Sequence, residues 1–155
     1  MAGNVKPIPQ GYHSVTPYLY VKGATKALDF YKQALGATEK FRMPMADGRI
    51  GHAEITIGDS VVMLADEFPE RNVRGPQTLG GVSSSLMIYV EDVDATAQRF
   101  IKAGGKVQRP IENQFYGDRS GSLLDAWGNH WYIASHMEDL TPEEIAERAA
   151  AAGRR

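Results

Sequence analysis

The fold is decided by residues 18–36, YLYVKGATKALDFYKQALG, which return in altered form at residues 87–105, MIYVEDVDATAQRFIKAGG. The displacement between the two stretches is constant at 69 positions (90 − 21 and 105 − 36). A second match, of residues 57–61 with residues 127–131, needs a displacement of 70 (128 − 58) and predicts one inserted residue. A repeated unit of this kind cannot bury its apolar face alone. We therefore predict one core made of two modules.

Length and composition indicate one globular domain of ordinary charge. The chain has 155 residues, 43% of them hydrophobic, and a formal net charge of −2. There is no basic stripe, so nucleic acid is not an expected partner. The absence of cysteine excludes disulfides, thiolate metal sites and a cysteine nucleophile. Neither a signal peptide nor a membrane-length apolar run is present, so we expect a cytoplasmic protein with no membrane partner.

Residues 14–67 form the first predicted module, with the element order β-α-β-β-β. Residues 14–21 alternate and are rich in β-branched and aromatic side chains, which predicts a strand. Apolar and small residues at helical spacing predict a helix over residues 24–34, and Gly36 is placed to end it. Three short strands separated by turn signals are predicted at residues 39–43, 52–57 and 61–65.

Residues 84–137 repeat this order as the second predicted module. A strand is predicted at residues 86–90, and Asp92 or Asp94 caps a helix that runs to Ala103. Three further strands are predicted near residues 106–109, 121–125 and 130–135.

Two segments lie outside the modules. Residues 68–83 contain the glycines and prolines typical of a linker. Residues 141–155 are predicted to form a C-terminal helix and tail, because Thr141 and Glu144 have the spacing of a capping box. This helix is expected to pack on the body of the protein or on a partner subunit. The modules together are expected to make a single domain over residues 11–145.

Strand alternation assigns the two faces of the predicted sheet. In the third strand of the first module, Ala53, Ile55 and Ile57 form an apolar set, which we place under the helix. The opposite set then lines a concave side, which is expected to form a mostly apolar ligand cavity with a few polar groups. By the same parity and by the repeat, that side carries His52, Glu54, Thr56, Thr16, Tyr18, Tyr20, Ser85, Met87 and Tyr89.

Several sequence blocks resemble the vicinal oxygen chelate superfamily, which includes glyoxalase I, extradiol dioxygenases and bleomycin- and fosfomycin-resistance proteins. They are the tandem modules, the Asp29-Phe30-Tyr31 helix leading to Gly36, and residues 125–129, DAWGN. A departure is Asp-Ala-Trp-Gly at 125–128, where the family usually has Asp-Pro-Phe-Gly. The blocks most similar to its PhnB-like branch are residues 15–19 (VTPYL), 48–54 (GRIGHAE), 114–121 (QFYGDRSG) and 133–136 (IASH).

This resemblance covers roughly residues 11–145 and implies an α+β fold, with tandem β-α-β-β-β modules that form a curved mixed sheet around a cavity. It also implies a homodimer, because relatives commonly pair modules across subunits. Metal-dependent relatives place His or Gln on the first strand of each module and a carboxylate on the last. Those positions fall here on Thr16, Ser85, Val62 or Met63, and Tyr132. None is a preferred ligand of a divalent metal, so we expect no metal, no cofactor, and neither glyoxalase I nor dioxygenase activity.

His52 and Glu54 are the first candidate chemical pair, since they lie two apart on one strand face. They fit a base held by a carboxylate, or two ligands of a displaced metal site completed by His130. They equally fit a polar wall in which both side chains bond each other or Arg49.

The polar segment 113–120 is the second candidate. Arg119 has the geometry to clamp a carboxylate or phosphonate, which would anchor an anionic ligand at the mouth of the cavity. The alternative is a surface turn held by an Asp118–Arg119 pair, with Tyr116 as a plug of the cavity. His13 and His136 lie outside the predicted strands and are expected to be surface residues, and Trp127 and Trp131 to be packing residues.

Two functional hypotheses remain open. The first is a binder of a small, partly aromatic or anionic molecule, such as a sequestering resistance-type protein. The second is a lyase, isomerase or dioxygenase-type enzyme that uses the displaced site around His52, Glu54 and His130. No serine-based triad is readable, and the catalytic residues of such an enzyme stay unassigned. The candidate ligand-binding residues are His52, Glu54, Tyr18, Tyr20, Met87, Tyr89, Tyr116 and Arg119.

Overall fold

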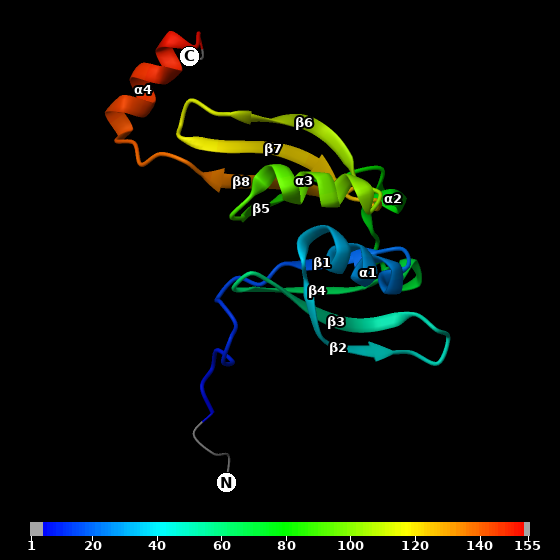
Figure 1. Cartoon of the computed structure of the whole chain (residues 1–155). Helices are drawn as coiled ribbons and strands as arrows, with labels where there is room; N and C mark the ends of the chain where they lie inside the picture. The colour runs from blue at the N-terminus through cyan, green and yellow to red at the C-terminus, as the bar shows by residue number, and fades with distance from the viewer. Residues whose placement is uncertain (1–4, 154–155) are drawn as a thin grey trace. The chain divides into compact units, whose positions relative to one another are not determined.

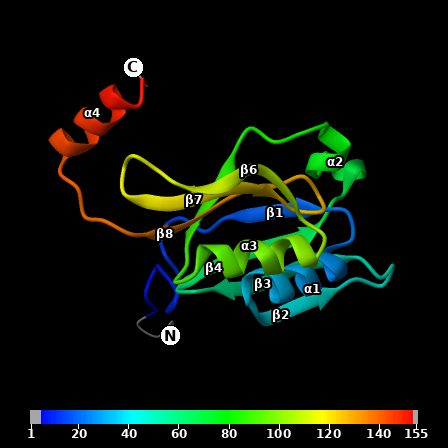
Figure 2. The same ribbon diagram turned by 45° about the horizontal axis from the view of Figure 1, so that its top comes forward.

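The structure is a computed structural model that describes residues 5–153. The chain divides into two compact units, Met1–Gly81 and Val82–Arg155, and the division falls inside the segment expected to be a linker. Each unit contains one four-stranded mixed sheet with a helix packed on one face (Figure 1; Figure 2). The expected α+β class is therefore confirmed.

The first unit has the predicted β-α-β-β-β order. The elements are β1 (Tyr18–Val21), α1 (Ala24–Leu35), β2 (Thr38–Pro44), β3 (Ile50–Ile57) and β4 (Ser60–Asp66). The strand order in the sheet is β1-β4-β3-β2, with β1 parallel to β4 and the other neighbours antiparallel. Helix α1 ends at Gly36, which adopts the left-handed conformation with φ 64°.

The second unit repeats this arrangement. Its elements are β5 (Ser85–Tyr89), α3 (Val93–Lys102), β6 (Lys106–Asn113), β7 (Asp118–Leu124), β8 (His130–His136) and α4 (Pro142–Ala151). The strand order in its sheet is β5-β8-β7-β6. The Asp92 side chain accepts a hydrogen bond from Ala95 N at 2.9 Å, so Asp92, and not Asp94, caps helix α3.

The register corrects one sequence prediction. Tyr18 pairs with Met63 and Met87 pairs with Tyr132, so both strands of each parallel pair are displaced by 69 positions (87 − 18 and 132 − 63). The displacement of 70 predicted for the last strand is therefore wrong. The match that suggested it aligned two glycine-containing turns, and these turns do not set the strand register.

The segment between the modules is more ordered than a linker. It contains a 3-10 turn, Pro69–Arg71, and the short helix α2, Pro76–Leu79. The Glu67 carboxylate accepts hydrogen bonds from Gly75 N at 3.0 Å and from Thr78 Oγ1 at 2.7 Å. A Cβ atom at Gly75 would lie 2.7 Å from the Tyr20 carbonyl oxygen, so glycine is required there. Local polar contacts that composition does not reveal therefore order this segment.

The two faces of the first sheet are as alternation predicted. Ala53, Ile55 and Ile57 are buried on the side that α1 covers. The opposite side, which we call the first open face, carries alternate residues of all four strands. Its central members are Tyr18, Tyr20, Phe41, Met43, His52, Glu54 and Met63.

The corresponding side of the second sheet, away from α3, is the second open face. Leu123 and Ile133 are fully buried on the α3 side, so the alternate residues of β7 and β8 face the other way. The second open face carries Met87, Tyr89, Asp118, Ser120, Ser122 and Tyr132.

The side chain of Asp125 stabilises the Asp-Ala-Trp-Gly-Asn turn before the last strand. Its buried carboxylate accepts hydrogen bonds from Trp127 N at 3.0 Å, Asn129 N at 2.9 Å, Asn129 Nδ2 at 3.0 Å and Trp131 Nε1 at 3.1 Å. Trp131 is fully buried and Trp127 is buried as well, as expected of packing residues.

Helix α4 begins at the predicted capping box. Thr141 Oγ1 accepts from Glu144 N at 3.2 Å, and Glu144 Oε2 accepts from Thr141 N at 2.8 Å. None of its residues is buried, so within the described chain α4 does not pack on a core. No helix in residues 5–153 is long and apolar enough to cross a membrane.

Candidate functional site

A chain of hydrogen bonds runs across the first open face. The Tyr18 hydroxyl lies 2.7 Å from His52 Nδ1, and His52 Nε2 lies 3.2 Å from Glu54 Oε1. The other oxygen of the carboxylate, Glu54 Oε2, accepts a hydrogen bond from the Tyr12 hydroxyl. Three predicted site residues are thus brought together, and Tyr12 joins them.

Strand geometry places these side chains. His52 and Glu54 are alternate residues of β3, so both point away from α1. Tyr18 reaches them from β1, across β4, which lies between the two strands. Tyr12 comes from the segment before β1, and sequence reasoning missed it because that segment has no periodic pattern.

Lys40 is a second residue that sequence reasoning missed. Its Nζ lies 3.6 Å from Glu54 Oε2 and 4.0 Å from the centre of the Tyr12 ring. In the β2–β3 register Glu39 pairs with Ile55 and Phe41 pairs with Glu54, so Lys40 is the extra residue of a β-bulge. Bulges redirect side chains and are common next to functional sites. Here the bulge puts the ammonium group beside a buried carboxylate.

The site keeps Glu54 ionised. Its burial, with 4% of the residue exposed, opposes ionisation, but hydrogen bonds from Tyr12 and His52 and the charge of Lys40 outweigh burial and lower the pKa of Glu54. Burial, with nearby Tyr20 and Glu54, raises the pKa of Tyr18, so its phenol stays neutral. Because a carboxylate can only accept, a neutral imidazole of His52 donates from Nε2 to Glu54 and accepts at Nδ1 from Tyr18.

Aromatic and thioether groups surround this polar centre. The Tyr18 and Tyr20 ring centres are 5.0 Å apart, and those of Phe41 and His52 are 5.6 Å apart. Tyr20 and Phe41 remain 37% and 43% exposed, and Met43 is more exposed still. The first open face therefore combines an ionised carboxylate with accessible apolar surface, a composition typical of small-molecule sites.

The residues at the superfamily's usual metal positions do not fit a metal ion. In the first unit Val62 is buried toward α1, and Met63, on the first open face, offers only a thioether. In the second unit Tyr132 offers a phenol on the second open face. Across residues 5–153 no group of three His, Cys, Asp or Glu side chains is arranged to hold a metal.

A smaller polar cluster lies at one end of the second open face. The Tyr89 hydroxyl donates to Asp118 Oδ2 at 3.0 Å, and His136 Nδ1 lies 2.7 Å from Asp118 Oδ1. His136 Nε2 lies 3.0 Å from Asp139 Oδ1, and hydrogen bonds to the two carboxylates raise the pKa of His136. His136 is exposed, as predicted, but it belongs to β8 and does not lie outside the strands. It stands at the end of β8 and pairs with a buried Asp118.

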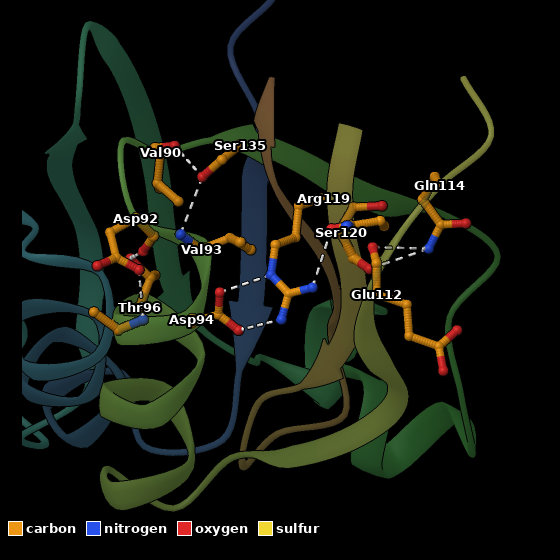
Figure 3. A network of polar contacts seen from close by, with 12 residues as sticks. Val90, Asp92, Val93, Asp94, Thr96, Glu112, Gln114, Arg119, Ser120 and Ser135 are labelled. Atoms are coloured by element: carbon orange, nitrogen blue, oxygen red, sulfur yellow. Dashed lines mark hydrogen bonds and ion pairs between the residues drawn. The ribbon is translucent and has the colours of Figure 1, made fainter. Parts of the chain in front are cut away.

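Arg119 does not lie on the second open face (Figure 3). Its Nε and Nη2 atoms each lie 2.7 Å from a carboxylate oxygen of Asp94, in the first turn of α3, and its Nη1 lies 3.1 Å from Asn113 Oδ1. Residues alternate along β7, so Arg119 faces the helix side, whereas Asp118 and Ser120 face away from it. The predicted Asp118–Arg119 pair is replaced by the Asp94 pair, which occupies the guanidinium fork.

The structure thus distributes the predicted residues among three places. Tyr18, Tyr20, His52 and Glu54 come together on the first open face. Met87 and Tyr89 lie on the second open face, where the Tyr116 hydroxyl lies 3.1 Å from Ser120 Oγ. Arg119 lies on the α3 side, and four of the predicted residues share the first open face, where Glu54 is buried.

Comparison with known proteins agrees with this architecture. An uncharacterized protein of Mycobacterium bovis is 35% identical over 99% of this chain and 99% of its own. The crystal structure of a Pseudomonas aeruginosa protein, PA1353, matches with a TM-score of 0.64 and 26% identity over 81% of this chain and 99% of that chain. A PhnB protein from Bacillus cereus shares the fold with a TM-score of 0.64 at 19% identity, over 79% of this chain and 99% of that chain.

The family match rests on most of the sequence. Residues 11–133 match the model of the Glyoxalase/Bleomycin resistance protein/Dioxygenase superfamily. This range contains the whole first repeat, the second repeat as far as the middle of β8, and every residue of the hydrogen-bonded chain on the first open face. The protein belongs to the Glyoxalase/Bleomycin resistance protein/Dioxygenase superfamily.

Proposed function

We propose that this protein binds a small molecule on its first open face, without the metal site usual in its superfamily. The observation that carries the proposal is Glu54, an ionised and almost fully buried carboxylate on the side of the sheet that α1 leaves uncovered. Burying a charge is costly unless partners compensate it. Glu54 has such partners, and a charge maintained beside exposed aromatic rings is typical of a ligand site.

The side chains have separate roles in this proposal. Tyr20, Phe41 and Met43 give apolar contact to the body of the ligand, since their exposed surface loses water on binding. His52 and Glu54 orient its polar end. The proposal does not include the second open face, where the buried charge, Asp118, lies at one end of the face and is bonded to Tyr89 and His136.

A ligand screen with face-specific variants tests the proposal. Small molecules that raise the melting temperature of the wild type are measured by calorimetry against Tyr20→Ala and Phe41→Ala. Loss of an aromatic contact is expected to weaken binding by about 1–2 kcal/mol. The matched control is Tyr89→Ala, on the second open face, which is expected to bind like the wild type. A ligand that depends on Tyr89 and not on Tyr20 contradicts the proposal.

Proton-transfer catalysis, of the kind used by lyases and isomerases, is a second candidate. The specific observation in its favour is the order Tyr18–His52–Glu54, in which an imidazole bonded to a carboxylate meets a phenol at 2.7 Å. Deuterium uptake by a bound carbon acid in D2O, followed by NMR, tests it. Deuterium uptake that is abolished in His52→Gln, while the ligand still binds, supports the hypothesis of an enzyme. If the wild type binds the ligand but shows no uptake, only the hypothesis of a binding protein remains.

The proposal also includes a homodimer in the cytoplasm, which the family resemblance supports. Light scattering at micromolar concentration is expected to give the mass of two chains. A monomer mass over the whole concentration range contradicts this part and leaves the proposed ligand site unaffected.

A further inference from the structure

We propose that the group by which the ligand is anchored is a protonated amine, which takes the place of the Lys40 ammonium between Glu54 and the Tyr12 ring. The inference rests on the proposed function and specifies the ligand's charge. It differs from the anionic ligand that the sequence suggested through Arg119.

The first step is that this place already holds an ammonium group. Lys40 Nζ lies 3.6 Å from Glu54 Oε2 and 4.0 Å from the centre of the Tyr12 ring. A carboxylate on one side and an aromatic ring on the other are the two groups that bind an ammonium ion most favourably. The geometry of an amine site is therefore present in the chain itself.

The second step is that the Glu54 carboxylate is held in place by its neighbours, whereas the Lys40 ammonium group stands at the end of a flexible side chain. Glu54 lies within β3, with His52 and Tyr12 bonded to its two oxygens. Lys40 stands at a bulge in the edge strand β2, on a flexible four-carbon stem, and a third of its side chain is exposed. Since the Glu54 side chain is only 6% exposed, its charge needs a cation, and an incoming ammonium group would supply the charge that Lys40 removes when it turns to water.

The third step is that the two arginines nearest to Lys40 in the first sheet already pair with carboxylates. Arg42, also on β2, points to the α1 side and pairs with Glu39 through two hydrogen bonds of 2.5 and 2.7 Å. Arg49, the residue before β3, pairs with Asp47 and Glu70. When Lys40 moves away, the first open face presents a net negative charge, which attracts an amine and repels a carboxylate.

The fourth step concerns the rest of the ligand. Tyr18, Tyr20 and Phe41 lie on the same face as Glu54, with the Tyr18 and Tyr20 rings 5.0 Å apart. An aromatic or alkyl body attached to the ammonium would contact these rings while its charge remains beside Glu54. The ligand class is thus a primary amine with an apolar body.

Three probes of similar size test the charge: 2-phenylethylamine, 3-phenylpropionate and 3-phenylpropan-1-ol. Their binding is measured near neutral pH by NMR titration of the whole protein. The amine is expected to bind most tightly, the alcohol more weakly and the carboxylate most weakly. Glu54→Gln is expected to weaken amine binding about tenfold or more, the scale of a lost charge-assisted hydrogen bond. Binding of the neutral alcohol is expected to change little.

Lys40→Met provides the decisive variant, because removal of the resident cation is expected to tighten amine binding about threefold, the scale of a partly exposed ion pair. The matched control is Lys26→Met, an exposed lysine of α1, which is expected to have no effect. Unchanged or weaker amine binding in Lys40→Met overturns the inference, as does tighter binding of the carboxylate or no binding of the amine. If a ligand of another charge still depends on Tyr20, the proposed function stands without the amine.

Discussion

Two buried carboxylates of the first unit, Asp66 and Glu54, differ in what they bind. Asp66 accepts hydrogen bonds from the backbone N–H groups of Gly23, Ala24 and Ile50, at 2.7, 3.0 and 2.7 Å. It therefore ties α1 to the sheet and has a structural role. Glu54 is bonded instead to side chains, those of Tyr12, His52 and Lys40. Side-chain partners can rearrange when a ligand arrives, whereas backbone partners cannot.

Asp125 provides a prediction at the scale of one residue. Asp125→Ala leaves four buried donors of Trp127, Asn129 and Trp131 without their acceptor. The free energy of unfolding is expected to fall by about 3 kcal/mol, since each unsatisfied buried group costs about 1–3 kcal/mol and relaxation recovers part of it. Urea denaturation measures the change. Asp59→Ala, at a side chain that is 90% exposed, serves as the control and is expected to change little. Equal effects of the two substitutions would show that the Asp125 contacts do not hold the turn.

At the scale of elements, charged contacts connect helices to strands on the side away from the site. Glu39 of β2 pairs with Lys32 of α1 at 2.6 Å and with Arg42 of its own strand at 2.5 Å. Hydrogen bonds from Arg42 and Lys32 lower the pKa of Glu39 from 4.5 to about 2. This contact anchors α1 to the edge strand.

The lowered pKa of Glu39 predicts how stability depends on pH. A carboxyl whose folded pKa is depressed stabilises the fold above its unfolded pKa of 4.5 and loses that contribution as pH falls through about 2. Between these values the wild type is expected to lose about 1 kcal/mol more than Glu39→Gln, with allowance for solvent screening. Urea midpoints measured across this pH range check it. If the wild type also loses about the same stability relative to Asp59→Asn, the loss at low pH is not specific to Glu39.

Helices α3 and α4 are expected to differ in how much they contribute to the stability of the fold. α4 buries none of its residues, so deletion of residues 141–155 is expected to change the free energy of unfolding by less than about 0.5 kcal/mol. Phe100 of α3 is fully buried, and Phe100→Ala is expected to cost about 3–5 kcal/mol. Chemical denaturation compares the two variants. A large loss of stability on deletion of α4 would show that this helix packs against a second copy of the chain or another surface.

At the scale of the whole molecule, the repeat allowed most of the fold to be predicted from the sequence. Both modules, their element order and the burial of Ala53, Ile55 and Ile57 follow from periodicity, which is a local property. The location of His52 and Glu54 on the uncovered face followed for the same reason.

What could not be predicted depends on contacts between distant residues. The bulge at Lys40 changes which residues of β2 face each side of the sheet. The two adjacent polar residues, Glu39 and Lys40, interrupt the alternation there and were the only hint of the bulge in the sequence of this strand. Tyr12 reaches Glu54 across 42 positions from a segment without a pattern. The predicted pairing of Arg119 with Asp118 was wrong because the actual partner, Asp94, lies 25 positions away in the sequence, and only the fold brings the two side chains together.

The central claim is that the first open face binds the ligand, and backbone NMR of the 155-residue chain tests it most directly. A ligand found by the melting-temperature screen is titrated into the labelled protein, and the amide shifts are mapped on the sequence. The account predicts that the largest shifts fall in β1, β2 and β3, around Tyr20, Phe41 and Glu54, with little change in β5 to β8. Saturable shifts confined to the second unit, around Tyr89 and His136, would contradict it.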